Sequence, residues 1–313
     1  MFRHTCRVVA LTAALAASSV HALVEDFSSD PFATWSFGVG DNSNSQFTWN
    51  TDLPKYTGDA AGSLTAHLNS SLPTARFDRA LGGSYTDTDS FTLAARFSFQ
   101  LTSAPGDQFM QIAFGLVNSA QTGGDRTGSA STSADVYHTV EFNYFPNVST
   151  FFSTGPTLSP AVFGANKSDN AFNNFAAFFF SEADLGDNTT GITELPQALT
   201  LQATLTYNGI AKTLALTIHR VEADGSLTLL NIEQPPMSLT SLPPFTNYDG
   251  AAPFVVDTLA IMAYRDGYTT ASAPSLEADV TFERFEFTVI PEPSTALLTL
   301  GALAVVGLLG RRR

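Results

Sequence analysis

The sequence predicts an all-β protein, a two-sheet antiparallel jelly-roll sandwich framed by two apolar terminal segments. Three observations support this class. Apolar residues alternate with other residues along several segments, which is the pattern of half-buried strands. Short turns rich in Gly, Asn and Asp separate these segments, and such turns join antiparallel strands. No long segment outside the termini has the 3.6-residue period of an amphipathic helix.

The clearest strand lies between residues 91 and 99. It reads Phe-Thr-Leu-Ala-Ala-Arg-Phe-Ser-Phe, so that large apolar side chains recur on one face. Phenylalanine is also the commonest aromatic residue of the chain, with 26 Phe against 8 Tyr and 2 Trp. Aromatic side chains suit pleated, half-buried surfaces, so the composition agrees with the pattern.

Residues 199–229 form a predicted β-meander. Residues 199–207 and 213–221 alternate in the same way and are joined through Asn208-Gly209, while Asp224-Gly225 marks a turn before residues 227–229. Because these connections are short, neighbouring segments should pair antiparallel.

The last predicted strand contains a change of phase. Val280 and Phe282 share one phase, whereas Phe285, Phe287 and Val289 share the opposite one. A β-bulge at Glu283-Arg284 would bring both sets onto the same face of a sheet.

The first 22 residues have the pattern of a secretory signal peptide. Arg3 and Arg7 precede an apolar run from Val8 to Ala17, and Ser19-Val20-His21-Ala22 offers small or aliphatic residues for cleavage after Ala22. The apolar run is short for a bilayer-spanning helix. We therefore expect signal peptidase to remove residues 1–22 during export.

Residues 290–313 have three features of a membrane-sorting tail. Pro291-Glu292-Pro293 comes first, an uncharged apolar stretch from Ser294 to Gly310 follows, and the last residues are Arg311, Arg312 and Arg313. The prolines mark the start of a predicted C-terminal hydrophobic helix, which at about 1.5 Å per residue would reach about 25 Å, close to the span of a bilayer. The arginines should stay in the cytoplasm and leave the large domain outside.

This order of features resembles the PEP-CTERM sorting signal. The resemblance implies that an exosortase recognises and cleaves the tail. It also implies an inner-membrane anchor before processing, and the cell surface or the exopolysaccharide matrix as the destination. The resemblance indicates where the protein is sorted, and it does not indicate what the protein binds or catalyses.

The remaining single domain comprises residues 23–289. Its lack of cysteine and its negative net charge exclude or disfavour several classes of function. The only cysteine, Cys6, lies in the leader, so a thiol nucleophile or a cysteine metal site is excluded from the domain. Without the five arginines and the one glutamate of the terminal segments, ten basic and 28 acidic residues remain, a formal charge of −18. Such a surface repels nucleic acid and anionic lipid, and it suits neutral sugars, divalent cations or plain solubility.

One segment of this domain could carry binding chemistry. Residues 139–147 read Thr-Val-Glu-Phe-Asn-Tyr-Phe-Pro-Asn. In a strand, Glu141, Asn143 and Phe145 lie on one face, and Asn147 follows a proline bend. Oxygen donors at this spacing could hold a hard cation, and Ca²⁺ is the cofactor that they suit best. The alternative is a solvated strand edge followed by an Asn-containing turn.

The order of this segment and those before it is similar to the L-type lectins of the concanavalin A-like fold. The similarity rests on residues 97–99, residues 112–116, a Gly/Ser-rich stretch and then residues 140–147. It implies roles for five residues: Glu141 as a transition-metal ligand, Asn143 as a bridging ligand, Phe145 as a carbonyl donor, Asn147 as a calcium ligand, and Asp107 as a sugar-contacting carboxylate. Asn143 stands where that family has Asp, which lowers the expected cation affinity.

The same fold hosts laminarinase-type glycoside hydrolases, whose active strand carries a set of carboxylates. Here Glu141 is followed by Asn143 and Phe145 where that strand has acids, and a lone carboxylate cannot serve as both acid and nucleophile. We therefore expect a non-catalytic surface or matrix protein with extracellular polysaccharide as its partner. A structural matrix protein without a specific ligand and a divergent glycoside hydrolase are the alternatives.

Overall fold

The structure is a computed structural model that describes residues 21–37, 46–50, 62–69, 74–103, 110–120, 138–145, 157–164, 170–172, 178–179, 200–230, 236–239, 253–265 and 277–291. Their regular structure consists of strands and a short 3-10 helix, η1 (Pro31–Ala33). Within these residues, no helix is long and apolar enough to cross a membrane. The helix predicted from Ser294 to Gly310 lies outside the described residues.

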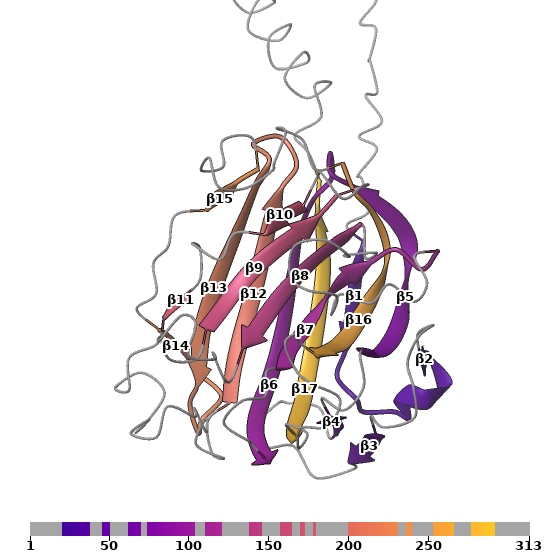
Figure 1. Ribbon diagram of the computed structural model, residues 1–313, viewed down its shortest axis with the longest axis vertical. Helices are drawn as coiled ribbons and strands as arrows, with labels where there is room; N and C mark the ends of the chain where they lie inside the picture. Colours follow the sequence, from indigo (N-terminus) through magenta and orange to yellow (C-terminus); the bar gives the residue numbers. More distant parts are fainter. Residues whose placement is uncertain are drawn as a thin grey trace, which may run out of the picture.

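Two antiparallel sheets form the domain (Figure 1). Sheet A has nine strands, in the order β14 (Leu227–Leu229), β13 (Thr213–Val221), β12 (Thr200–Asn208), β6 (Ser90–Ser103), β17 (Glu277–Ile290), β4 (Ser63–Asn69) and β3 (Gln46–Asn50), with β1 (Ala22–Glu25) on β17 and β15 (Met237–Ser238) on β13. Sheet B has eight strands, in the order β10 (Asn170–Phe172), β9 (Thr157–Phe163), β8 (Thr139–Phe145), β7 (Met110–Val117), β16 (Val255–Arg265), β5 (Thr74–Thr86) and β2 (Trp35–Phe37), with β11 (Phe178–Phe179) on β9. The predicted two-sheet antiparallel sandwich is confirmed.

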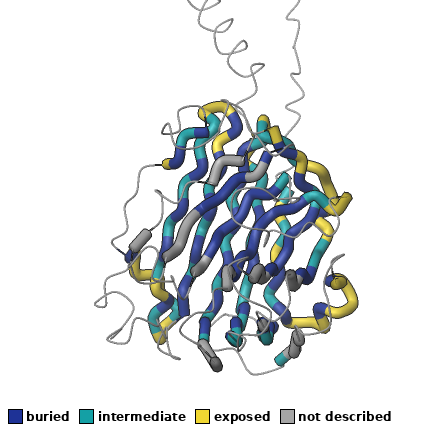
Figure 2. Tube along the Cα trace, in the orientation of Figure 1, coloured by how far each residue is buried: buried dark blue, intermediate teal, exposed yellow. Residues whose placement is uncertain are grey.

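The core lies between the two sheets. In β6, the buried positions alternate with half-buried ones from Phe91 to Phe99, as the sequence pattern predicted. Phe77, Phe114 and Phe142 of sheet B belong to the same buried cluster. Figure 2 shows that buried positions run along the strands of both sheets, whereas the exposed ones gather at turns and ends.

Phe114 stands at the centre of an aromatic cluster that joins the sheets. Its ring centroid lies 4.7 Å from that of Phe142, nearly parallel, and 5.8 Å from that of Phe285 in sheet A, edge to face. Phe97 and Phe282 complete the cluster. Such pairs contribute about 0.5–1.5 kcal/mol each beyond area burial. A phenylalanine-rich core thus stabilises a domain without cysteine.

Both sequence predictions about strand register are confirmed. β12 pairs with β13 from Thr200 opposite Val221 to Asn208 opposite Thr213, and β13 pairs with β14, which is the predicted meander. In β17, the register against β6 shifts between Phe282 and Arg284. This bulge keeps the apolar side chains on both sides of it buried in the core.

Glu25 holds the N-terminal segment where it passes from one sheet to the other. β1 pairs with β17 in sheet A, and β2 pairs with β5 in sheet B. Between them, the Glu25 carboxylate accepts hydrogen bonds from Phe27 N (2.9 Å) and Trp35 Nε1 (2.9 Å) and forms an ion pair with Arg79. Only 7% of the Glu25 side chain is exposed, so this is a buried carboxylate with several donors.

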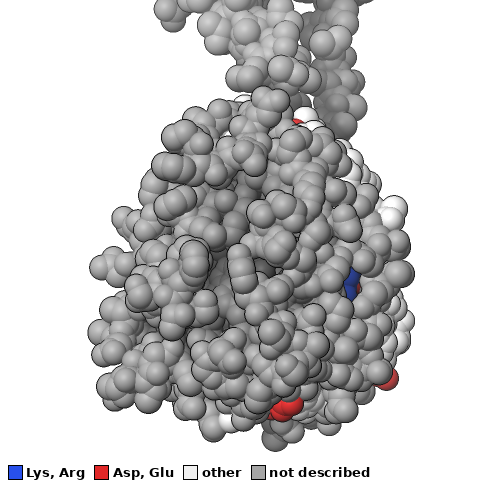
Figure 3. All heavy atoms as spheres, viewed as in Figure 1, with Lys and Arg blue, Asp and Glu red and all other residues white. Residues whose placement is uncertain are grey.

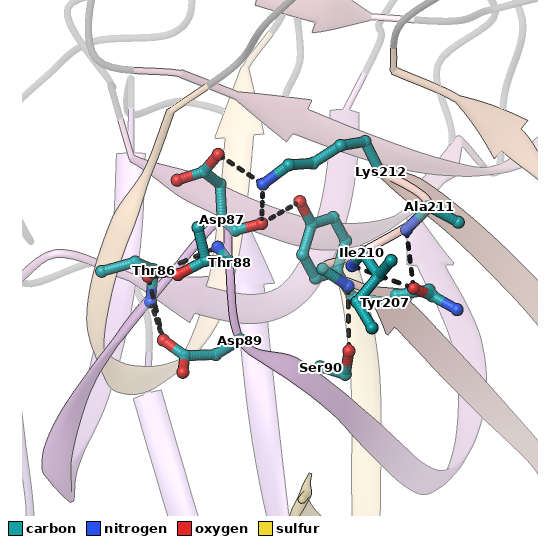
Figure 4. A network of polar contacts seen from close by, with 11 residues as sticks. Thr86, Asp87, Thr88, Asp89, Ser90, Tyr207, Ile210, Ala211 and Lys212 are labelled. Carbon is teal, nitrogen blue, oxygen red and sulfur yellow. Dashed lines mark hydrogen bonds and ion pairs between the residues drawn. The ribbon is translucent and has the colours of Figure 1, made fainter. Parts of the chain in front are cut away.

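The turn between β5 and β6 and the turn between β12 and β13 are joined by hydrogen bonds (Figure 4). Both turns lie at the end of the sandwich where β17 ends, since Ile290 is paired with Ser90. Lys212 Nζ lies 2.7 Å from Asp87 Oδ2, and the Tyr207 hydroxyl donates to the carbonyl oxygen of Asp87 at 2.8 Å. A Cβ added at Gly209 would lie 2.4 Å from the carbonyl oxygen of Thr88. The close approach of the two turns therefore requires glycine at position 209.

Candidate functional site

β8 places Glu141 and Asn143 on the outer face of sheet B. Val140 and Phe142 belong to the core between the sheets, so the alternating residues Glu141 and Asn143 point to the opposite face. Both side chains are 0% exposed there, and β8 is paired on both edges, with β7 and β9. The interpretation of this segment as a solvated strand edge is therefore wrong.

Glu141 belongs to a row of residues that crosses six strands of sheet B. The strand registers place the following residues next to one another: Ala161, Glu141, Gly115, Ala260, Asp78 and Ser36. Directly paired residues share a face of the sheet. Two carboxylates therefore stand on either side of two small residues, three strand spacings apart, which is about 14 Å between backbones.

A second row lies two residues along the strands. It consists of Ser159, Asn143, Ala113, Met262 and Arg76. Ala113, Ala260 and Met262 form a small buried cluster with Val117. The outer face of sheet B thus has an apolar centre between two polar flanks. We call this surface the outer floor and define it by its centre, Ala113, Gly115, Ala260 and Met262, and its flanks, Glu141 with Asn143 and Arg76 with Asp78.

Gly115 sets the position of Glu141 on this floor. A Cβ added at Gly115 would lie 2.4 Å from the carbonyl oxygen of Val140 and 2.6 Å from Glu141 Cβ. Real Cβ atoms essentially never come so close to other atoms. Any larger residue at position 115 would therefore displace the strand that carries Glu141.

Arg76 and Asp78 form the opposite flank as a largely buried ion pair. Arg76 Nε donates to Asp78 Oδ1 at 2.8 Å, and the two side chains are 10% and 15% exposed. Burial raises the pKa of Asp78, and the hydrogen bond and charge of Arg76 only partly offset this rise. On the flank opposite Glu141, the pKa of Asp78 therefore lies above its ordinary value because the carboxyl group is buried.

Asp257 lies beside this flank, at the register shift of β16. It accepts hydrogen bonds from Ser119 N (2.8 Å), Ser119 Oγ (2.7 Å) and Thr258 Oγ1 (2.9 Å). Burial alone would raise the pKa of Asp257, but these hydrogen bonds and the charge of Arg76 bring the pKa below its ordinary value of 3.8. The carboxylate thus ties the end of β7 to β16.

Replacing Asp257 with Asn should lower the free energy of unfolding at pH 7 by about 1 kcal/mol, because an amide is a weaker acceptor for these donors. The folded-state pKa lies below the unfolded one. The contribution of the carboxylate is therefore present above the unfolded pKa and is lost as pH falls through the folded pKa. Urea unfolding at several pH values should give a constant difference above about pH 5 that shrinks as the pH falls below the ordinary pKa of an aspartate, about 3.9. A difference that persists in acid would contradict this assignment.

The structure brings together only part of the predicted site. Glu141 and Asn143 are neighbours on one face of β8, and Phe145 is the last residue of that strand. Asp107 and Asn147 lie outside the described residues. The pairing of Ile112 with Tyr144 places the start of β7 and the end of β8 at one end of sheet B.

Sequence reasoning missed the flank made by Arg76 and Asp78. The alternation of Arg76, Phe77 and Asp78 was a usable signal, since a buried Phe between two charged residues indicates a strand with one polar face. Trp35 is 4% exposed and its ring stacks on that of Phe77 with the centroids 5.3 Å apart, so it is a core residue.

The described candidate ligands, Glu141 and Asn143, do not by themselves form a metal site. Among the described ranges, no three His, Cys, Asp or Glu side chains lie together in a way that could hold a metal ion. Glu141 contributes one carboxylate and Asn143 one amide, whereas calcium sites take six to eight oxygens with several carboxylates.

Figure 3 shows one face of the domain in the orientation of Figure 1. The described acidic and basic atoms in view are few and lie toward the periphery of the outline.

The C-terminal residues 289–313 match the family model of the PEP-CTERM protein-sorting motif. The motif indicates an exported protein that is sorted to the cell surface, and it implies processing by an exosortase. No curated protein matches the sequence.

Solved structures similar to this chain include lectins. Peanut lectin is 9% identical with a TM-score of 0.41, and the match covers 88% of this chain and 100% of that one. Lectin II from Ulex europaeus is 10% identical with a TM-score of 0.40, over 86% of this chain and 98% of that one. A lectin from Bauhinia forficata in complex with GalNAc is 12% identical with a TM-score of 0.36, over 82% and 97%.

Proposed function

We propose that this protein is a non-catalytic, glycan-associated protein of the cell surface or the exopolysaccharide matrix, exported with a cleaved signal peptide. Its partner is extracellular polysaccharide, bound where β7 starts and β8 ends. The observation that carries the proposal is the outer floor, an apolar centre of small side chains with oxygen-bearing residues on both flanks. Because this face is buried, it would act as a rigid support for a sugar site and would not itself contact the sugar.

Burial determines how the outer floor takes part. Glu141, Asn143 and Ala113 are 0% exposed, so the floor supports the site from beneath and does not itself meet the solvent. The resemblance to L-type lectins assigns the contacts with the ligand to Asp107 and Asn147 as well. The acidic domain favours this class of partner too, because a neutral polysaccharide is not repelled by negative charge.

The spacing of the carboxylates argues against a glycoside hydrolase. Inverting enzymes hold their two carboxyl groups about 6.5–9.5 Å apart, and retaining enzymes about 5–5.5 Å apart. The backbones of Glu141 and Asp78 are about 14 Å apart across the row, and Asp78 is paired with Arg76. Within the described residues, the outer floor thus lacks a carboxylate pair suited to glycosidic cleavage.

Binding to polysaccharide tests the proposal directly. The full-length chain in detergent would be applied to immobilised exopolysaccharide from the producing cells and to a glycan array, beside the variants Glu141→Gln and Asn147→Ala. We expect each variant to bind at least about tenfold more weakly, which corresponds to about 1.4 kcal/mol. Glu286→Gln is the matched control, because Glu286 is half-exposed on sheet A and forms an ion pair with Arg284.

The alternatives give different results in the same experiment. A folded protein that no polysaccharide retains would sink the proposal and leave a structural matrix protein. Release of reducing sugars from β-glucan would indicate a hydrolase, against the spacing argument.

Chelation should change the stability of the domain only slightly. We expect EDTA to lower Tm by less than about 2 °C, because one carboxylate and one amide hold Ca²⁺ weakly and a weakly bound cation adds little by mass action. Thermal unfolding of the full-length protein, with and without EDTA, measures this shift. A fall of many degrees that Ca²⁺ restores would reveal a cation site completed by further residues.

A further inference from the structure

The two ends of the domain lie side by side. β1 pairs with the last part of β17, with Ala22 opposite Thr288 and Leu23 opposite Phe287. Val289 N donates to the carbonyl oxygen of His21 at 3.0 Å. The predicted cleavage point after Ala22 and the first residue of Pro291-Glu292-Pro293 are therefore neighbours in space. In Figure 1, the start of β1 and the end of β17 lie toward the same end of the sheets.

Two turns surround this point. Ile290 at the end of β17 is paired with Ser90 at the start of β6, and Ser90 Oγ accepts a hydrogen bond from Gly209 N at 3.0 Å. We call this end of the sandwich the exit rim and define it as residues 86–90, 208–212 and 290.

The exit rim combines exposed aliphatic side chains with partnered acids. Ile210 is 71% exposed and Ile290 is 41% exposed. Of the rim's two acids, Asp87 forms an ion pair with Lys212, and Asp89 accepts a hydrogen bond from Thr86 N at 2.7 Å. The rim therefore carries a formal charge of −1, from two acids and Lys212, and its one ion pair joins the two turns.

The tether between the rim and the predicted membrane helix is short. Ile290 is the last residue of β17, and the apolar run begins at Ala296. Residues 291–295 span at most about 17 Å when fully extended. While the tail is intact, the end of the domain from which it leaves must stay within this distance of the bilayer.

We propose that the exit rim rests on a phospholipid bilayer before the tail is cut, with Ile210 and Ile290 at the lipid surface. The inference rests on the proposed export and on the C-terminal membrane anchor that the sequence predicts. In this orientation the strands run away from the membrane surface, because the rim lies at one end of the strands. The start of β7 and the end of β8 lie at the opposite end of sheet B, since Thr86, paired with Val255, is at the rim end and Arg265, paired with Met110, is at the other. The candidate glycan site therefore points away from the membrane.

Site-directed fluorescence tests this orientation, because the domain has no cysteine of its own. The chain from Leu23 to Arg313, as signal peptidase would leave it, would carry either Ile210→Cys or Ala223→Cys, each labelled with an environment-sensitive dye. It would be reconstituted into vesicles of phosphatidylethanolamine and phosphatidylglycerol that contain a nitroxide-labelled lipid. Ala223 is an exposed turn residue at the far end of β13, about 30 Å away along nine strand residues.

We expect nitroxide lipid to quench the Ile210→Cys label at least about threefold more than the Ala223→Cys label, because the two positions are separated by about a domain's length along β13. A flexible Gly-Ser insertion between Ile290 and Pro291 should reduce this difference. Equal quenching of the two labels in chains that float with the vesicles would overturn the rim contact and leave the anchoring intact. Chains that do not float would overturn the anchoring and the inference that rests on it.

Discussion

Replacing Glu25 with Ala should lower the free energy of unfolding by about 3–5 kcal/mol, the usual cost of removing one partner from a buried charged network. The substitution leaves Trp35 Nε1, Phe27 N and the Arg79 guanidinium without the carboxylate that they share. Arg79 is only 19% exposed, so water compensates poorly for the loss. Chemical denaturation of the purified protein measures the change.

Glu286→Ala is the matched control for this prediction. Glu286 also forms an ion pair with an arginine, Arg284, but the two side chains are 46% and 33% exposed. An exposed pair of this kind contributes about 0–1 kcal/mol. Equal effects of the two substitutions would show that Glu25 does not hold the N-terminal segment between the sheets.

Deleting residues 291–313 should remove the protein from the membrane fraction, reducing the membrane-bound amount by about tenfold or more, because insertion of a hydrophobic helix is effectively irreversible. The deletion begins after the last residue of β17, so the described domain keeps all its strands. Cell fractionation followed by immunoblotting measures the distribution. The truncated protein should appear among the soluble exported proteins.

A second variant separates the helix from its charges. Deleting Arg311, Arg312 and Arg313 leaves the apolar stretch intact but removes the charges that favour a cytoplasmic C-terminus. We expect this variant to remain in the membrane fraction and to be processed less. If the protein without residues 291–313 stays in the membrane fraction as well, the tail is not the anchor. Unprocessed full-length protein in the cytosol would contradict export itself.

Much of the fold could be predicted because it depends on spacing within single strands. The alternation from Phe91 to Phe99 and the phase change between Phe282 and Phe285 were sufficient to predict the core face of β6 and the bulge of β17. Both features are local, since the side-chain period of a strand is two and one extra residue reverses it.

The candidate site could be predicted only in part. Glu141 and Asn143 were expected on one face of a strand, which is a local property. Their burial was not expected, because burial depends on what packs over a face and a strand pattern does not contain that information. The opposite flank was missed for a related reason, since Arg76 and Asp78 reach the same face only through the pairing of β5 with β16.

The sequence by itself determined the strand periods, the absence of thiol chemistry from the domain and the sorting address at residues 289–313, because each of these depends on residues close together in the chain. Only the tertiary structure decided that a floor of small residues separates Glu141 from Asp78, and that Ala22 lies beside Thr288. Both arrangements follow from the register between strands that are distant in sequence. That register is decided by how the whole core packs, so no short stretch of residues specifies it.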